Sequence, residues 1–599
     1  MAARSCDVLV IGGGATGVCA AYDAARRGLR VILTEMNDLT TGTSGRYHGL
    51  LHSGARYVVN DPESAHECIQ ENRILRRIAP QIVEDTGGLF VAAAHDPADF
   101  VPVWEAGCAA VGIEHEELSI AAARRLEPAL RPDLARAFRV PDGAVDGFDL
   151  GHVFTRAAES FGAETLLYHA VTALAYGTDG MVATLADRRS GETKTVAARW
   201  VLNAAGPWAG EVAALAGHDL TVRWSRGLMI AMNVRWVNTI INRLRPPDDG
   251  DILVPVGTVS VIGTTSVPVE RPDDHTIEAW EVSDLLAEGE AVIGGFREAR
   301  ALRAWAGVRP LYEPPGEHAG AQGRAVRRTF AVVRHGTGLT TVVGGKLTTA
   351  RLMAEKALDD ICAGLGIDAR CTTADERLPM SEHGRRYHTL GGRLAKLEHG
   401  QMPGALICEC ELVSQRQLEE AINAYTELPS LDDLRRDLRL GMGPCQGGFC
   451  AVRATSILRH ARDLPAPEAV AALRAFVDER FKGGRPLLWG QQLRQFLLDE
   501  MIYRRTLGLD RWQEPRAVGD ITLPSWARAS GPLPDGTGRR VVVIGAGLAG
   551  LAAAIQAVQT GAHVQVVATG IGRLLLTPGW YALGAFREQA GVAAFRAWL

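Results

Sequence analysis

The sequence predicts an α/β protein whose first domain is a doubly wound, dinucleotide-binding sheet. Three observations lead to this prediction. A strand, a glycine-rich turn, a helix and a second strand ending in an acid follow one another between Cys6 and Glu35. Four cysteines lie in two short motifs between positions 408 and 450, and the strand and glycine-rich turn recur from Arg540. We therefore expect a large α/β domain, a small metal-binding module and a partial second βαβ unit.

Composition is that of an ordinary globular protein, with 47% hydrophobic and 22% charged residues among 599. A net charge of −5 gives no support for nucleic-acid binding. No apolar stretch predicts a membrane span, and the N-terminus leads directly into a strand, so we expect no signal peptide. Six of the ten cysteines are scattered, which favours buried thiols in a reducing cytosol: Cys6, Cys19, Cys68, Cys108, Cys362 and Cys371.

The N-terminal fingerprint begins with an apolar strand, Cys6 to Ile11, followed by Gly12-Gly13-Gly14-Ala15-Thr16-Gly17. In this G-x-G-x-x-G spacing, the first glycine permits the tight turn, the second lets the backbone approach a pyrophosphate, and the third lets helix and strand pack closely. A helix to Arg27 and a strand from Leu29 to Thr34 follow, and Glu35 then suits the ribose hydroxyls of an adenosine.

Several later segments favour FAD over NAD. The stretch after Glu35 is rich in Gly, Ser and Thr, and two further strands, 199–203 and 339–343, end in glycine-containing turns. The second turn leads into a helix from Ala350, whose N-terminus suits the negative charge of a reduced flavin. The candidate cofactor contacts are Gly12, Gly14, Gly17, Glu35, Thr43, Ser44, Ala205, Gly206, Gly344, Gly345 and Lys346.

Domain boundaries follow from these pieces. An FAD-dependent oxidoreductase domain is expected over 1–370, with FAD-binding pieces at about 1–90, 160–225 and 320–370 and with α+β substrate-domain insertions at about 90–160 and 225–320. A cysteine module at 400–460, a helical docking tail at 461–512, a linker at 513–538 and the partial second unit at 539–599 complete the chain.

Four segments resemble FAD-dependent glycerol-3-phosphate dehydrogenases: Thr43 to Tyr57, Ile262 to Ser266, Gly307 to Leu311 and Gly344 to Thr349. Within this family the chain is most similar to the A subunits of the anaerobic, quinone-linked branch, whose flavin domain is also followed by a cysteine-bearing module. Gly49 stands where aerobic relatives carry a lysine, which supports this branch.

The resemblance implies that Arg56, Arg309 and Arg328 grip the substrate phosphate, as guanidinium groups do well. Alcohol oxidation also needs a base for the hydroxyl proton, and His52 is the candidate because imidazole titrates near working pH. His48 is the alternative base, and a purely orienting role for His52 stays open. Lys346 is expected to bind the substrate oxygen or to stabilise a flavin anion, and the alternative is an ordinary surface lysine. Tyr57 is expected to donate a hydrogen bond to the substrate, and the alternative is an ordinary, half-buried tyrosine.

The four clustered cysteines are Cys408 and Cys410 in C-E-C, and Cys445 and Cys450 in C-Q-G-G-F-C, with 34 residues between the pairs. Four thiolates bind an iron–sulfur cluster or a structural zinc. Each pair precedes a predicted helix, at 414–425 and 451–461, and the charged run 432–437 is expected to be a solvated helix face. The module resembles [2Fe–2S] domains related to bacterioferritin-associated ferredoxin, and zinc remains the alternative.

The C-terminal segment repeats the first fingerprint at Gly545, but Ala568 stands where the ribose acid would be. It resembles the N-terminus of the anaerobic enzyme's B subunit, which binds FMN. About 60 residues are too few for a nucleotide domain. We expect a truncated fusion, or a segment completed by another chain, that binds FMN only with that partner.

The expected function is oxidation of sn-glycerol 3-phosphate to dihydroxyacetone phosphate, with electrons passing from FAD through an iron–sulfur centre to membrane quinone. The resemblance implies two partners at the cytoplasmic face of the inner membrane, namely a B-like flavin subunit with its membrane-anchor iron–sulfur subunit. Two alternatives stay open: an amino-acid or 2-hydroxy-acid dehydrogenase of the same FAD fold, and an iron–sulfur carrier whose flavin domain only binds.

Overall fold

The structure of the chain is a computed structural model that describes residues 4–312, 329–379, 381, 389–402, 404–488, 490–509, 540–546 and 548–571. These residues belong to two compact units, Met1–Gln492 and Leu493–Leu599. Among the described helices, none is both long and apolar enough to cross a membrane.

The first unit is built on an eight-stranded sheet with β1 (Arg4–Ile11) at its centre. Its parallel core runs in the order β9 (Glu164–Leu166), β2 (Val31–Thr34), β1, β12 (Thr193–Asn203) and β20 (Leu339–Gly344). Antiparallel strands β11 (Met181–Asp187), β10 (His169–Tyr176) and β19 (Phe330–Arg334) extend it. Val8 to Ile11 of β1 and the four residues of β2 are buried and mostly apolar, which is typical of central parallel strands.

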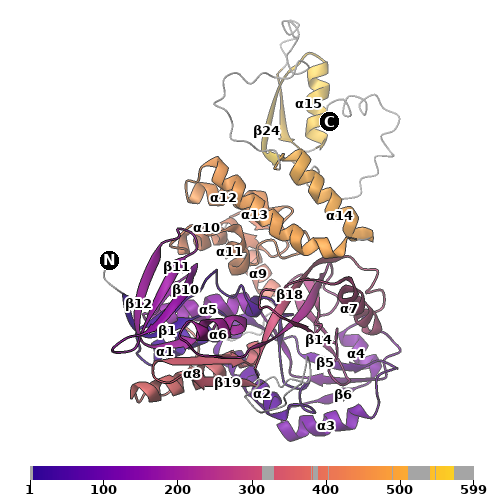
Figure 1. The fold of residues 1–599 in the computed structure, drawn as a ribbon. Helices are drawn as coiled ribbons and strands as arrows, with labels where there is room; N and C mark the ends of the chain where they lie inside the picture. The colour runs from indigo at the N-terminus through magenta and orange to yellow at the C-terminus, as the bar shows by residue number, and fades with distance from the viewer. Residues whose placement is uncertain are drawn as a thin grey trace. The chain divides into compact units, whose positions relative to one another are not determined.

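Helices cover both faces of this sheet (Figure 1). Helices α1 (Ala15–Arg26), α5 (Gly147–Ser160) and α8 (Ala350–Leu365) share one core, in which Tyr22 meets Phe154 edge to face at 5.8 Å. Helix α6 (Ala209–Ala214) packs in a second core with β20. Between β2 and α5 the chain leaves the domain of the eight-stranded sheet, contributes strands to other sheets, and then returns.

A second, nine-stranded sheet is built from the segments inserted between the strands of the first sheet. Its order is β17 (Val267–Val269), β13 (Arg223–Met232), β16 (Val259–Gly263), β15 (Ile252–Val256), β14 (Ile240–Arg243), β5 (Gly88–Ala92), β7 (Arg136–Val140) and β6 (Glu116–Leu118), with β18 (Ala301–Leu311) also on β13. Helices α2 (Pro62–Ile78), α3 (Phe100–Val111), α4 (Ile120–Leu126) and α7 (Ala279–Val292) accompany it, and β3 (Leu50–Leu51), β8 (Gly143–Val145) and β4 (Val83–Glu84) form a small third sheet.

The cysteine module is a small helical layer around a two-stranded ribbon. The ribbon is β21 (Leu406–Cys408) and β22 (Val413–Ser414), and the helices are α9 (Thr389–Glu398), α10 (Gln415–Ala424), α11 (Leu431–Leu438), α12 (Cys450–Ala461) and α13 (Ala466–Gly484). Ser414 begins α10 as a capping box, accepting a hydrogen bond from Gln417 N. Helix α14 (Gly490–Met501) follows and contains the boundary between the two units.

The charged run 432–437 does not form a solvated face, contrary to the sequence-based expectation. Asp433 and Asp437 are buried, with 0% and 8% exposure, and the Arg436 side chain is 13% exposed. Helix α11 instead packs against α5, and its charged groups form ion pairs with the flavin domain. Charged side chains bury in this way when each has an opposite charge to pair with.

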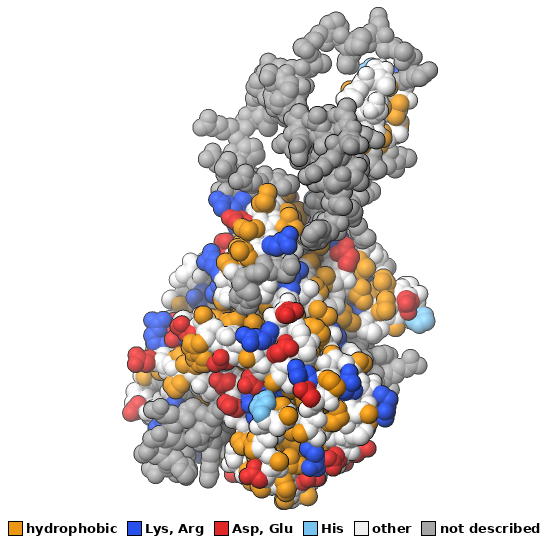
Figure 2. All heavy atoms as spheres, turned by 90° about the vertical axis from the view of Figure 1, so that its right-hand side faces the viewer, with side chains coloured by type: hydrophobic (Ala, Val, Ile, Leu, Met, Phe, Trp, Pro, Cys, Tyr) orange, Lys and Arg blue, Asp and Glu red, His pale blue; other side chains and the backbone are white. Residues whose placement is uncertain are grey.

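In the second unit, β23 (Arg540–Ala546) and β24 (His563–Ile571) pair in parallel and α15 (Leu548–Gln559) connects them. This is one βαβ unit, and the predicted linker 513–538 lies outside the described residues. On the molecular face shown in Figure 2, acidic and basic side chains of the described residues are interspersed, in keeping with the small net charge.

Candidate flavin site and cysteine centre

One cavity of about 1440 Å³ lies at the carboxyl ends of the central parallel strands. Ligands bind at this edge in open α/β sheets. All the residues predicted to contact flavin or substrate, except Gly17 and Arg328, line it, although they come from segments as far apart as Gly12 and Lys346. Arg328 lies outside the described residues.

The glycine-rich turn has the geometry that the spacing predicts. Gly12 has φ +107°, and a Cβ there would lie 2.7 Å from the Ala204 carbonyl oxygen. A Cβ on Gly17 would lie 1.8 Å from the Gly12 oxygen, so Gly17 serves helix packing and does not reach the cavity. At Gly14 the nearest atom is Ser44 Oγ, at 3.2 Å, which leaves the cavity side open to a phosphate.

The acid at the end of β2 is already oriented by the backbone. Gly13 N donates to one Glu35 carboxylate oxygen at 2.7 Å, and Asn37 N donates to the other at 2.9 Å. Burial raises the pKa of Glu35, and these two backbone hydrogen bonds oppose that effect. Each oxygen keeps a second lone pair for a ribose hydroxyl.

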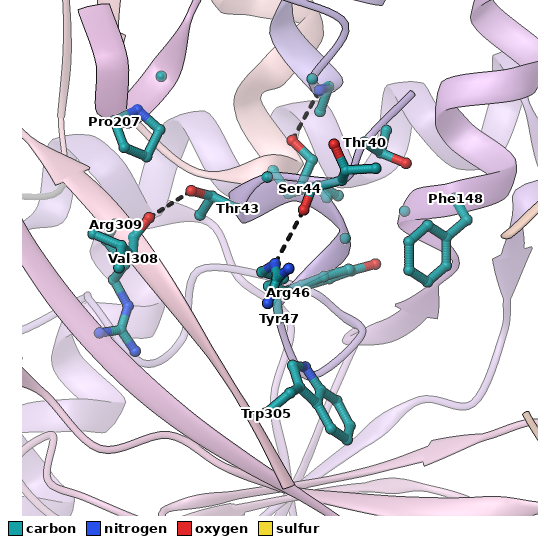
Figure 3. Close-up of a pocket in the computed structure, with 18 of the residues that line it drawn as sticks. Thr40, Thr43, Ser44, Arg46, Tyr47, Phe148, Pro207, Trp305, Val308 and Arg309 are labelled. Atoms are coloured by element: carbon teal, nitrogen blue, oxygen red, sulfur yellow. Dashed lines mark hydrogen bonds between the residues drawn. The ribbon is translucent and has the colours of Figure 1, made fainter. Parts of the chain in front are cut away.

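The segment after β2 supplies the cavity wall around the expected flavin ring (Figure 3). Ser44 Oγ accepts a hydrogen bond from Ala15 N at 2.9 Å, and the Thr43 hydroxyl donates to the Val308 carbonyl. Arg46 Nε donates to the Thr41 carbonyl at 3.0 Å. These bonds hold the segment between the helix α1 N-terminus and strand β18.

Both candidate bases, His48 and His52, line the cavity, with ring centroids 6.2 Å apart. Burial, and after it the charge of Arg309, lowers the pKa of His48 to about 3. Burial, and after it His48 and Lys346, lowers the pKa of His52 well below its ordinary value of 6.5. Both imidazoles are therefore neutral at pH 7, which is the form that accepts a proton.

Neutral, buried histidines predict a loss of stability in acid. Because the folded pKa of His48 is lowered to about 3 from 6.5, the unfolded chain binds more protons between these values, and stability falls as the pH falls through them. We expect the Tm of the purified protein to decrease below about pH 6.5, and His48→Asn to flatten this decrease. An equally steep decrease in wild type and variant, measured by calorimetry, would contradict the assignment.

The Arg56 guanidinium is held in place by one of its nitrogens, Nη2, while the other, Nη1, has no acceptor among the described residues. Its Nη2 lies 2.7 Å from Asp251 Oδ2 and donates to the Asp248 carbonyl at 3.0 Å. Its side chain is 7% exposed, and Nη1 is buried without a hydrogen-bond partner among the described residues. A buried guanidinium N–H without an acceptor is costly, and a substrate oxygen in the cavity would supply one.

Arg309 reaches the same cavity from strand β18 (Figure 3). Its Nη2 donates to the Thr264 hydroxyl and to the Thr265 carbonyl, the latter at 3.1 Å. A Cβ on Gly227 would lie 2.3 Å from Arg309 Nη2, so a larger residue on this neighbouring strand would displace the guanidinium from its present position.

Lys346 and Tyr57 lie beside His52. The Lys346 Nζ is 4.7 Å from the Tyr57 ring centroid, and the His52 and Tyr57 centroids are 5.3 Å apart. Tyr57 thus positions the ammonium through a cation–π contact. The structure brings together His48, His52, Arg56, Tyr57, Arg309 and Lys346, all of which the sequence singled out.

Some site residues had no role assigned from sequence. Thr348 Oγ1 accepts a hydrogen bond from His52 N at 3.2 Å, and Thr264 binds Arg309. Both stand inside segments that resemble the family, so the motifs contained them without indicating their partners. Gly49 has φ +97°, which explains a glycine at this position.

The four clustered cysteines lie together as free thiols in two contacting pairs. Cys410 Sγ and Cys445 Sγ are 3.8 Å apart, about the separation of two thiolates on one tetrahedral metal ion with bonds of about 2.3 Å. The contact with Cys410 lowers the pKa of Cys445 to about 6, and the contact with Cys450 lowers the pKa of Cys408. This donor set fits a two-iron cluster, in which each iron takes two thiolates.

The cysteine loops adjoin the flavin cavity. Met442 and Gln446, which flank Cys445, line the cavity. The Arg439 guanidinium binds Asp146 Oδ2 at 2.7 Å and Glu411 Oε2 at 3.0 Å, so it ties the residue after Cys410 to the N-cap of helix α5.

Comparisons with known proteins agree with these features. Three family descriptions match the chain: FAD dependent oxidoreductase at 7–351, BFD-like [2Fe-2S] binding domain at 406–460, and FAD binding domain at 540–589. They confirm the predicted fold class and show FAD and a [2Fe–2S] cluster as the cofactors.

Similar proteins include the A1 subunit of the anaerobic glycerol-3-phosphate dehydrogenase of Haloferax volcanii, 39% identical over 89% of this chain and 96% of that protein. The A subunit of the anaerobic glycerol-3-phosphate dehydrogenase of Escherichia coli (strain K12) is 41% identical, over 85% of this chain and 98% of that protein. Among solved structures, the FAD complex of Bacillus halodurans glycerol-3-phosphate dehydrogenase is similar in fold, with a TM-score of 0.57, 21% identity and coverage of 82% of this chain and 97% of that chain.

Proposed function

Because this chain belongs to the family of anaerobic glycerol-3-phosphate dehydrogenase A subunits, we propose that it oxidises sn-glycerol 3-phosphate to dihydroxyacetone phosphate. One observation carries the proposal. A single cavity is lined by the nucleotide turn, by the neutral imidazoles of His48 and His52, by Arg56 and Arg309, and by Gln446 next to Cys445.

Each side chain has a separate task in this proposal. FAD supplies the two-electron acceptor, and the [2Fe–2S] cluster accepts electrons singly. His52 Nδ1 or Nε2 accepts the proton of the substrate hydroxyl, while Lys346 and Tyr57 orient that oxygen. Arg56 and Arg309 hold the phosphate, with Arg56 Nη1 as the available donor.

Four thiolates hold the cluster: Cys408, Cys410, Cys445 and Cys450. Support for an electron route comes from Met442 and Gln446, which flank Cys445 in the chain and lie on the wall of the flavin cavity. The cluster then passes electrons on to the next acceptor, and the substrate reacts in the flavin cavity.

We infer that the onward acceptor is membrane quinone, reached through partner subunits. Support comes from the names of the relatives, which are A subunits and so imply other subunits. A B-like flavin subunit together with a membrane-anchor iron–sulfur subunit would place this chain peripherally at the cytoplasmic face of the membrane. Within the described residues, 540–571 forms one βαβ unit, and we propose that it holds FMN only with a partner chain.

The proposal is tested by anaerobic optical and EPR spectra before and after addition of glycerol 3-phosphate. In wild type, the flavin absorbance will bleach and a reduced-cluster signal will appear. In Cys408→Ser and Cys445→Ser, bleaching will persist, whereas the cluster signal and electron transfer to quinone will be lost. A substrate that bleaches no flavin, or serine variants that transfer electrons normally, would overturn the proposal.

A further inference from the structure

We propose that the cysteine module has a second function: helix α11 closes the adenosine end of the FAD cavity, and Arg436 holds it closed. The cavity wall at this end combines residues from both parts of the chain. Asn37 and Asp38 follow the ribose acid Glu35, and Asp433 and Arg436 come from α11. The module would thus retain the cofactor as well as carry the cluster.

Arg436 forms a direct bond between the two parts at this end of the cavity. Its Nε donates to Asp38 Oδ2 at 2.7 Å, and its Nη2 donates to Asp433 Oδ1 at 2.5 Å. Asp38 is fully buried, and its Oδ1 has no hydrogen-bond partner among the described residues. Arg436 is therefore the main compensation for a buried carboxylate three residues after Glu35.

A second contact joins α11 to Tyr168, in the turn between β9 and β10, which is itself bonded to the segment after β2. Asp433 accepts hydrogen bonds from the Tyr168 hydroxyl at 2.6 Å and from Ser430 N at 2.8 Å. Tyr168 N in turn donates to the Asn37 carbonyl at 3.0 Å, and Arg189 stacks on the Tyr168 ring at 3.5 Å.

These contacts make cofactor retention depend on docking of the module. Opening the adenosine end breaks the Arg436–Asp38 and Tyr168–Asp433 bonds. It also breaks the Arg156–Asp437 and Arg189–Asp433 ion pairs. Removing one partner of a buried pair leaves the other charge uncompensated, which favours the undocked state. FAD would then leave more quickly, even though neither Arg436 nor Tyr168 belongs to the proposed catalytic set.

The test measures FAD release from the purified, full-length holoprotein, as the rise of FAD fluorescence after dilution. Arg436→Met is expected to release FAD at least about tenfold faster than wild type, and Arg436→Lys, which keeps the charge, less so. The matched control is Arg416→Met in helix α10, where the arginine is 63% exposed and pairs with Glu420 of the same helix. It should release FAD at the wild-type rate.

Cluster absorbance and EPR report whether the module is intact in each variant. Unchanged FAD release in Arg436→Met with an intact cluster would overturn the proposal, as would equally fast release in Arg416→Met. If Arg436→Met does not fold, FAD release from Tyr168→Phe tests the proposal instead, because this variant removes only the hydrogen bond from the Tyr168 hydroxyl to Asp433. Release several-fold faster than wild type supports the closure, and an unchanged rate refutes it. The readout is independent of turnover.

Discussion

Replacing Arg309 by methionine will lower kcat/KM for glycerol 3-phosphate by a factor of about 10² to 10³. The guanidinium is held in the cavity by Thr264 and Thr265, and methionine keeps the apolar part of the side chain while removing the charge. A charge-assisted pair with a phosphate in such a site contributes roughly 3–4 kcal/mol. Most of the loss should appear in KM, because the phosphate is remote from the reacting carbon.

A matched control is Arg334→Met in strand β19, where the arginine is 40% exposed and pairs with Asp360. This variant should keep wild-type kinetics. Arg56→Ala should resemble Arg309→Met, with an added loss of stability because Asp251 loses a buried ion-pair partner. If both arginine variants keep near-normal turnover, the substrate carries no phosphate, and an amino-acid or 2-hydroxy-acid dehydrogenase becomes the better hypothesis.

Replacing His52 by asparagine will slow flavin reduction by glycerol 3-phosphate by about 10² to 10⁴-fold. Asparagine can keep a hydrogen bond to the substrate hydroxyl but cannot accept its proton. Stopped-flow measurement of flavin bleaching isolates this step from onward electron transfer. KM should change little, because the phosphate contacts remain.

His48→Asn is the comparison that identifies the base. If His52 is the base, His48→Asn keeps most of the bleaching rate, and the reverse order of effects would assign the role to His48. The pH profile gives a second check. Because burial lowers the pKa of His52 well below 6.5, it stays unprotonated at neutral pH. The rate should therefore stay level from pH 9 to about 7 and fall only in more acidic solution.

The sequence was sufficient wherever function depends on short-range spacing. The G-x-G-x-x-G turn is required by sterics that the structure makes explicit, since a Cβ on Gly17 would lie 1.8 Å from the Gly12 oxygen. Apolar runs located the central strands, and β1 and β2 begin within two residues of the predicted positions. The cysteine spacing likewise singled out four cysteines that the structure brings together.

The partners of buried charges could not be predicted. Arg56 pairs with Asp251, and Arg436 pairs with Asp38, which lies 398 residues earlier in the chain. Charged runs such as 432–437 have the same sequence pattern whether they face water or an interface, because the pattern contains no information on what packs against them. The expectation of a solvated face failed for that reason.

By itself, the sequence determined the nucleotide turn, the cofactor class and the cysteine set, because each depends on residues close together in the chain. The tertiary structure alone decided that the histidines are neutral, that Arg56 keeps a donor unused by the described residues, and that helix α11 walls the FAD cavity. These properties depend on burial and on ion pairs between distant segments, and packing of the whole unit creates both.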